Sequence, residues 1–234
     1  MVKTMEHVGC QLHSDYTDYY DGGLCCTELS HTLHLFRHRN SISMEGQMLR
    51  LQRAGLKTPI YGTLKEMCQW ASVMNLAPDF GGVAPLVIFN HQQQAELITL
   101  DVAKNLDPNQ FAMSYIAPHS HLAGAVVKYL QIGTLRAWLY CYATDGWKIR
   151  ANNCHTHLIP CNTPLPGNAS ATFHEPLFCI DFIVTHREAI AINFNTAPNL
   201  SALGLQSHFS KEDICRALLA HLDTSPIGKK EGAW

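Results

Sequence analysis

The chain has few charged residues and no long apolar segment. Asp, Glu, Lys and Arg make up 15% of its 234 residues, against about 25% in an average soluble domain. Disorder requires low apolar content, so 47% apolar residues exclude it except at the ends. A formal net charge of −2 argues against binding along a nucleic-acid backbone. No run of 18 apolar residues occurs, so we expect no membrane-spanning helix and no membrane partner.

Several short motifs of common sites are also missing. The sequence contains neither Gly-x-Gly-x-x-Gly nor a Walker-type loop, which excludes the two commonest phosphate-binding loops. The sequence also contains no Gly-x-Ser-x-Gly motif, so no serine is identified as a catalytic nucleophile. The nine cysteines include no Cys-x-x-Cys pair, and the first ten residues lack a signal-peptide pattern. We therefore expect reduced thiols and a cytoplasmic protein, in a host cytoplasm or a virion if the source is viral.

The most metal-like cluster is Cys154 and His157 followed by Cys161. Zinc sites usually combine two such closely spaced pairs, and only one is present. His119 and His121 would complete a site only through a tertiary contact. We expect ordinary turn and core residues here, and no zinc.

Apolar periodicity predicts four helices. Residues 43–55 have Ser43 as a capping residue and end at Gly55, and residues 63–74 have Thr63 as cap with Glu66 three positions on. Residues 93–105 and 211–221 complete the set, the latter capped by Ser210. Residues 25–39 have no clean period, so helix and strand both stay open there.

Short β-branched and aromatic runs predict strands over 8–13, 86–89 and 111–116. Two hairpins follow, 125–132 with 136–142 and 178–184 with 189–194. This order predicts an α+β fold with antiparallel hairpins, flanking helices and a C-terminal helix. We expect an N-terminal segment over 1–57 packed on the core, a main domain over 58–222 and a mobile tail over 223–234.

Three segments near the C-terminus carry the residues best suited to chemistry. Arg150 and Asn152 follow the first hairpin, where a guanidinium and an amide can hold a phosphate. In the second hairpin Asp181 on one strand and Asn193 and Asn195 on the next can face one cleft, because alternate residues of a strand share one face. One carboxylate with two amide oxygens is a set of hard ligands suited to Mg²⁺.

Together these segments resemble the C-terminal half of the ATP-grasp family, over residues 85–222, and in particular compact, phage-type members. In that family a strand carboxylate and a following Glu- or Asp-x-Asn with a nearby Pro hold the magnesium ions of ATP. Asp181 matches the first carboxylate, and Asn195 with Pro198 matches the second motif. Arg150 and Asn152 match the segment at the phosphates.

The resemblance extends to the segment before the first hairpin. Ser114, Tyr115 and Ile116 resemble the hinge strand whose backbone meets adenine, and Lys128 stands where a phosphate-binding basic residue is plausible. The sequence departs from the family at Asn193, where a carboxylate is usual, and at Ser114, where an acidic residue is usual. It also shows no Gly-rich phosphate loop around residues 90–96.

The resemblance implies an ADP-forming, ATP-dependent carboxylate–amine ligase working through an acyl phosphate, with ATP and Mg²⁺. Arg150 would be catalytic, Asp181, Asn193 and Asn195 would hold metal, and the substrate would be a small molecule or a peptide. A degenerate relative that binds a nucleotide or a protein without turnover is the alternative, as is a viral structural component keeping only the fold. A protein partner or self-association is compatible with each of these.

Overall fold

The computed structural model describes residues 43–73, 86–89, 94–120, 124–144, 146, 147, 149, 153–161, 163–166, 168–196, 198 and 205–224. The strand expected over 8–13, the undecided segment 25–39 and residues 225–234 of the expected tail lie outside this part of the chain. Asp223 and Thr224, which were expected in the tail, belong to the C-terminal helix. Within it, no helix is both long enough and apolar enough to cross a membrane.

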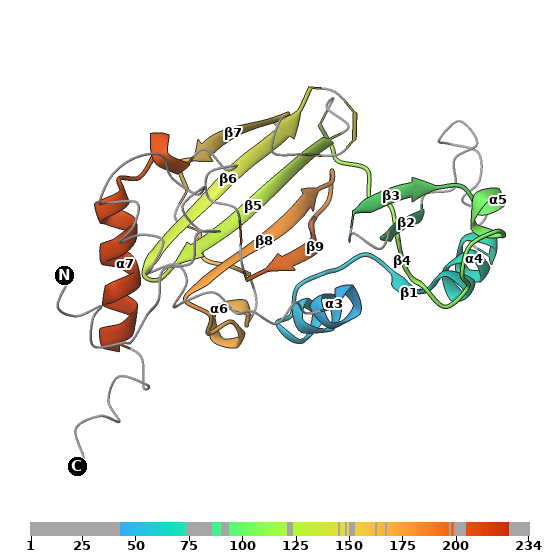
Figure 1. Cartoon of the computed structure of the whole chain (residues 1–234), viewed down its shortest axis with the longest axis horizontal. Coiled ribbons are helices and arrows are strands. Elements are labelled where there is room, and N and C mark those ends of the chain that lie inside the picture. The colour runs from blue at the N-terminus through green and yellow to red at the C-terminus, as the bar shows by residue number, and fades with distance from the viewer. Residues whose placement is uncertain are drawn as a thin grey trace, which may run out of the picture.

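Two antiparallel sheets form the frame of the molecule and lie at opposite ends of it in Figure 1. The four-stranded sheet has the order β1-β4-β2-β3. Its strands are β1 (Tyr61–Thr63), β2 (Leu86–Phe89), β3 (Ala95–Ile98) and β4 (Phe111–Ser114). The five-stranded sheet has the order β7-β6-β5-β8-β9. Its strands are β5 (Gly124–Ile132), β6 (Leu135–Ala143), β7 (Cys154–Ile159), β8 (Leu177–Val184) and β9 (Ala189–Asn195).

The small sheet is accompanied by α4 (Leu64–Val73) and the short α5 (Leu100–Ala103). The predicted start of α4 is confirmed: the Glu66 carboxylate accepts hydrogen bonds from the Thr63 amide and hydroxyl, both at 2.8 Å. This reciprocal capping satisfies amides that the first helical turn leaves without partners. Leu64, Met67 and Ala71 then pack into the core of this sheet.

The helix expected over 93–105 is wrong. Residues 95–98 form strand β3, which pairs with β2 from Ala95 opposite Phe89 to Ile98 opposite Leu86. Helical structure begins only after Thr99, whose hydroxyl accepts from the Val102 amide. Pairing with an apolar neighbouring strand has overridden the local helical preference of this segment.

The large sheet contains both predicted hairpins. Strands β5 and β6 pair continuously from Gly124 opposite Ala143 to Ile132 opposite Leu135, across the turn at Gly133. Gly133 has a φ of +59°, a left-handed conformation that favours glycine. Strand β7, which the sequence interpretation did not include, pairs with β6 and forms one edge of the sheet.

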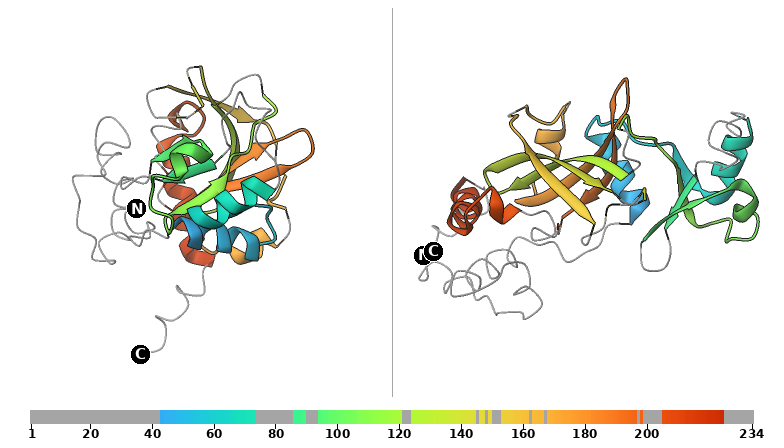
Figure 2. Two further views of the ribbon diagram at one scale, coloured as in Figure 1. Left: turned by 90° about the vertical axis from the view of Figure 1, so that its right-hand side faces the viewer. Right: turned by 90° about the horizontal axis from the view of Figure 1, so that it is seen from above.

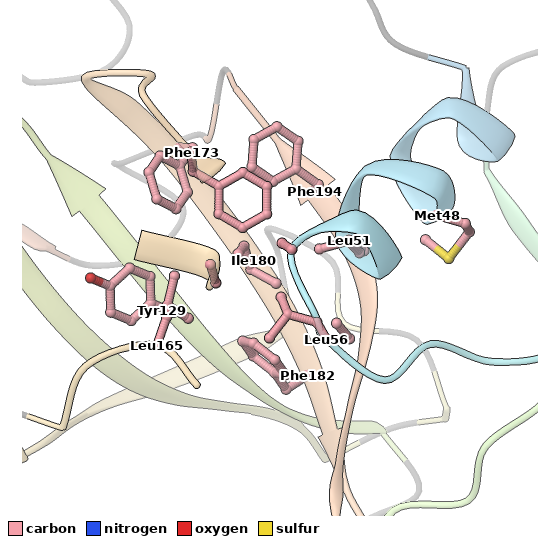
Figure 3. Close-up of a cluster of buried hydrophobic side chains, with 13 residues drawn as sticks. Met48, Leu51, Leu56, Tyr129, Leu165, Phe173, Ile180, Phe182 and Phe194 are labelled. Atoms are coloured by element: carbon pink, nitrogen blue, oxygen red, sulfur yellow. The ribbon is translucent and has the colours of Figure 1, made fainter. Parts of the chain in front are cut away.

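One face of the large sheet packs against α3 (Met44–Arg53) and α6 (Ala169–Thr172), as Figure 3 shows. The predicted cap of α3 is confirmed, because the Ser43 hydroxyl accepts from the Gly46 amide. The core on this face contains aromatic rings from three strands and the segment before β8. Its largest members are Tyr129, Phe173, Phe178, Phe182 and Phe194, with Met48 and Leu51 from the helix.

The opposite face carries the C-terminal helix α7 (Lys211–Thr224), which contacts β5 and β6. Ser210 caps it, since its hydroxyl accepts from the Asp213 amide at 3.1 Å. Ile214 and Leu218 are fully buried against Leu130, Ile132 and Leu139 of the sheet. This face is therefore covered near the β5–β6 turn.

Two connectors join the sheets, and both are attached to the turn between β8 and β9 (Figures 1 and 2). In the connector between α3 and β1, Lys57 forms an ion pair with Glu188, and its carbonyl accepts from the Ala191 amide at 2.8 Å. In the connector between β4 and β5, the His119 amide donates to the Val184 carbonyl at 2.8 Å. The His119 and His186 rings also hydrogen-bond, with Nδ1 and Nε2 2.9 Å apart.

Candidate functional site

A row of three polar side chains crosses the middle of the large sheet. Lys128 of β5 lies opposite Asp181 of β8, which in turn lies opposite Asn193 of β9. Directly opposed residues in antiparallel strands present their side chains on the same face. Leu130 and Cys179, two positions along from Lys128 and Asp181, belong to the core against α7, so the row lies on the α7 side of the sheet.

Both oxygens of the Asp181 carboxylate have partners in this row. Lys128 Nζ donates to Oδ1 at 2.6 Å, and Asn193 Nδ2 donates to Oδ2 at 3.2 Å. Cys179 lies two residues before Asp181 on β8, and its Sγ also donates to Oδ1 at 3.6 Å. The row is thus a hydrogen-bonded network centred on one carboxylate.

The Lys128–Asp181 ion pair is largely shielded from solvent. The exposed fractions of the two side chains are 14% and 15%. Burial lowers the pKa of Lys128, but the Asp181 charge, together with nearby thiols and the hydrogen bond, outweighs burial and holds that pKa above its ordinary value. The ammonium is therefore charged at every physiological pH.

Asn195 lies on the same face as Asn193, two residues further along β9 and opposite Cys179. A bulge between Asp181 and Phe182 shifts the register only beyond this region. The structure thus brings Asp181, Asn193 and Asn195 together with Lys128. Strand β9 is held from its outer edge by α3, because the Gln47 side-chain oxygen accepts from the Phe194 amide at 3.1 Å.

The three hinge residues expected from the sequence lie where the chain leaves the small sheet. Ser114 ends β4 and is buried, and its backbone and hydroxyl hydrogen-bond with Ile60. Tyr115 and Ile116 follow in the connector toward β5. The Tyr115 ring makes an edge-to-face contact with Trp147, with centroids 6.1 Å apart, and burial raises its pKa.

Arg150 and Asn152 lie outside the described residues. Their assignment to the phosphates stays a prediction from the sequence.

The oxygen donors of the row fit a magnesium ion that is shared with phosphate oxygens. Mg²⁺ takes hard oxygen ligands and usually one or two carboxylates, with water and phosphate supplying the rest. Asp181 would contribute one carboxylate, and Asn193 and Asn195, which lie on the same face, would contribute amide oxygens. Asp181 could bind a metal ion only if the Lys128 ammonium moved away from Oδ1. A phosphate oxygen would then replace the carboxylate as the hydrogen-bond acceptor of Lys128.

The Cys154–Cys161 segment is arranged differently from a zinc site. Residues 154–159 form β7, in which His155 and His157 stack on Tyr142 on one face. Cys154 alternates with them and lies on the other face with Cys141. Across the part of the chain that is described, no cluster of three or more His, Cys, Asp or Glu side chains could hold a metal ion.

We expect purified protein to contain well under one zinc per chain, because the cysteine and histidines of β7 face opposite ways. Elemental analysis after dialysis measures this directly. Stoichiometric zinc that disappears in the Cys154→Ser and His157→Ala variants would contradict the expectation.

Sequence reasoning did not assign the thiols around the row any role. Cys141, Cys154 and Cys179 come from three strands and share the face of Lys128. Their spacing in the sequence shows no motif, and only the strand register brings them together.

Comparisons with known proteins identify the fold. No protein-family model matches the chain, and no curated protein matches its sequence. Among solved structures, the macrocyclase MdnC from Microcystis aeruginosa, bound with precursor peptide MdnA, matches with a TM-score of 0.50 and 15% identity, over 82% of this chain and 62% of that one. A RiPP-associated ATP-grasp ligase of Chryseobacterium gregarium, in complex with ADP and a leader and core peptide, gives 0.50 and 12%, over 79% and 60%.

The ATP-grasp ligase PsnB, complexed with a minimal precursor, also matches with a TM-score of 0.50 and 12% identity, over 76% of this chain and 59% of that one. The chain thus spans 59–62% of the lengths of these three proteins. Their common architecture shows that this chain has an ATP-grasp fold of the α+β class, which confirms the fold expected from the sequence.

Proposed function

We propose that this protein is an ATP-dependent ligase that joins a carboxylate to an amine through an acyl phosphate. The observation that carries the proposal is the row of Lys128, Asp181 and Asn193 on adjacent strands of an ATP-grasp fold. A cation and hard oxygen donors on one face are the groups that phosphoryl transfer requires, since its catalysis rests on positioning and charge neutralisation.

The residues of the row divide the work as follows. Lys128 moves from Asp181 to a phosphate oxygen, where its charge neutralises the developing negative charge. Asp181, Asn193 and Asn195 would hold a magnesium ion, which would supply further neutralisation of the phosphates. Arg150 and Asn152, assigned from the sequence, would orient the transferred phosphoryl group.

The substrate carboxylate attacks the γ-phosphorus, the bond from phosphorus to the β–γ bridging oxygen breaks, and ADP leaves. An amine nitrogen then attacks the acyl carbon: the C–N bond forms, the bond from the acyl carbon to the phosphate oxygen breaks, inorganic phosphate leaves, and the nitrogen loses a proton to solvent. Two of the matched structures contain a peptide, MdnC its precursor peptide MdnA and the Chryseobacterium gregarium ligase a leader and core peptide, which makes a peptide carboxylate the first substrate to test.

Restoring a carboxylate at residue 193 should strengthen binding of magnesium–ATP. Asn193→Asp adds a charged oxygen donor beside Asp181, and a hard cation gains most from added negative charge. We expect about tenfold tighter binding, about 1.4 kcal/mol, measured by calorimetric titration of the nucleotide with Mg²⁺. Asp181→Asn, nearly identical in shape, should abolish the Mg²⁺-dependent part of binding.

Asn105→Asp is the matched control, because it adds the same charge at an exposed position beside the small sheet. It should leave the affinity unchanged. If Asn193→Asp and Asp181→Asn both behave like this control, the row holds no magnesium and the ligase proposal fails.

A second candidate is nucleotide or protein binding without turnover. It is favoured by Asn193, which leaves one carboxylate in the row, and by the engagement of that carboxylate with Lys128. ADP release in the presence of ATP, Mg²⁺, a peptide carboxylate and an amine separates the two candidates. Binding without ADP release in both the wild-type chain and Asn193→Asp would favour the second.

A further inference from the structure

Two cysteines on neighbouring strands lie beside the proposed nucleotide site. Cys141 of β6 is opposite Thr156 of β7, and Cys154 of β7 is opposite Ala143. Cys141 and Cys154 are therefore diagonal neighbours on the same face of the sheet, the face that carries Lys128. Cys141 is buried, whereas Cys154 is partly accessible at the sheet edge.

Both sulfur atoms converge on one hydroxyl group. Thr156 Oγ1 lies 3.6 Å from Cys141 Sγ and 3.5 Å from Cys154 Sγ. The two thiols are also close enough for each to change the pKa of the other. A hydrogen bond donated to a thiolate stabilises its anionic form.

The electrostatics of the pair assign different roles to its members. The hydrogen bond with Cys141 lowers the pKa of Cys154, and although burial opposes this, Thr156 and the charge of Lys128 add to it. The same hydrogen bond and burial raise the pKa of Cys141. Cys154 is thus the thiolate and nucleophile, and Cys141 is the protonated donor.

We propose that Cys154 is a peroxide-sensitive modification site and that Cys141 is the thiol that resolves it into a disulfide between β6 and β7. The Cys154 thiolate attacks one oxygen of hydrogen peroxide; the S–O bond forms, the O–O bond breaks, and hydroxide leaves. The Cys141 sulfur then attacks the sulfenic sulfur. The S–S bond forms, the S–O bond breaks, and water leaves with the Cys141 proton. One peroxide thus oxidises the Cys154 thiolate and the Cys141 thiol, and the products are one hydroxide, which solvent protonates, and one water.

Other described cysteines lack this arrangement. Burial raises the pKa of Cys68, which makes it a slow nucleophile. Cys161 is exposed, and its thiol contacts the hydroxyl and amide of Thr163, whose hydrogen bonds lower its pKa. Cys161 is therefore expected to react without forming an intramolecular disulfide.

The test is peptide mapping of the full-length chain after treatment with stoichiometric hydrogen peroxide and blocking of the remaining thiols. The expected product is a linked pair of peptides containing Cys141 and Cys154, lighter by two hydrogens than the reduced pair. In Cys141→Ser, the Cys154 sulfenic acid should instead be trapped by dimedone. In Cys154→Ser, Cys141 should stay reduced.

The pH dependence of iodoacetamide labelling tests the cause of the reactivity. Cys154 in the wild-type chain should reach half its maximal rate well below pH 8.5, roughly the value for a free cysteine. Thr156→Val removes the shared hydroxyl and should move this midpoint upward, whereas Thr156→Ser should not. A Cys154 that labels no faster than Cys68 at neutral pH, or that oxidises without linking to Cys141, would overturn the proposal.

Discussion

Gly133→Ala is expected to destabilise the protein by about 3 kcal/mol, because two costs combine at this turn. The glycine has a φ of +59°, which L side chains rarely adopt. A β-carbon there would also lie 2.0 Å from the Ala217 carbonyl oxygen and 2.8 Å from the α-carbon of Leu218, both backbone atoms of α7. The turn cannot keep its shape unless the helix moves away from Leu130 and Ile132.

Thermal unfolding measures this effect, and for a chain of this length we expect a fall in Tm of about 6–12 °C. Gly146→Ala is the matched control: its φ is +77°, but a β-carbon there would meet nothing within 4 Å. It therefore reports the conformational cost alone, about 1 kcal/mol. Equal losses in the two variants would mean that contact with α7 contributes nothing at Gly133.

Asp181→Ala is expected to cost about 3 kcal/mol, since it leaves the Lys128 ammonium without a counter-charge in a largely buried position. We place the value at the low end of the range for buried pairs, because the two side chains are 14% and 15% exposed. Chemical denaturation at neutral pH gives the change in unfolding free energy.

A double-mutant cycle separates the unpaired charge from other consequences of the substitution. Adding Lys128→Met to Asp181→Ala removes the unpaired ammonium and should recover more than half of the loss. The control is the exposed pair of Lys104 and Asp101, where Asp101→Ala should have no measurable effect. A double variant that is as unstable as the sum of its single variants would refute the unpaired-charge explanation.

Local signals in the sequence predicted the elements whose ends are set by neighbouring residues. Ser43, Thr63 with Glu66, and Ser210 each form their cap within three residues, and Gly133 marks its turn through its own left-handed backbone conformation. Strand β3 was predicted as helix because its pairing with β2 is not visible in its own composition. Strand β7 was missed because it is an edge strand with polar and apolar residues on both faces.

The candidate site was predictable only where it depends on neighbouring residues of one hairpin. The alternation of β8 and β9 places Asp181, Asn193 and Asn195 on one face, and that much follows from the hairpin. The ion pair of Asp181 with Lys128 joins residues 53 positions apart. The cluster of Cys141, Cys154 and Thr156 depends in the same way on the register of β6 and β7, which single-sequence patterns do not fix.

The fastening of both connectors to the β8–β9 turn has a mechanical consequence. Lys57 lies on one connector and His119 on the other. Each is bonded, by an ion pair or by hydrogen bonds, to the hairpin that carries Asp181 and Asn193. A movement of the small sheet relative to the large one would therefore act on β8 and β9 at the turn that joins them. The turn at Thr185–Glu188 and the polar residue Asp181 belong to one continuous hairpin, so a change in the position of the small sheet would reach the polar row through the backbone of β8 and β9.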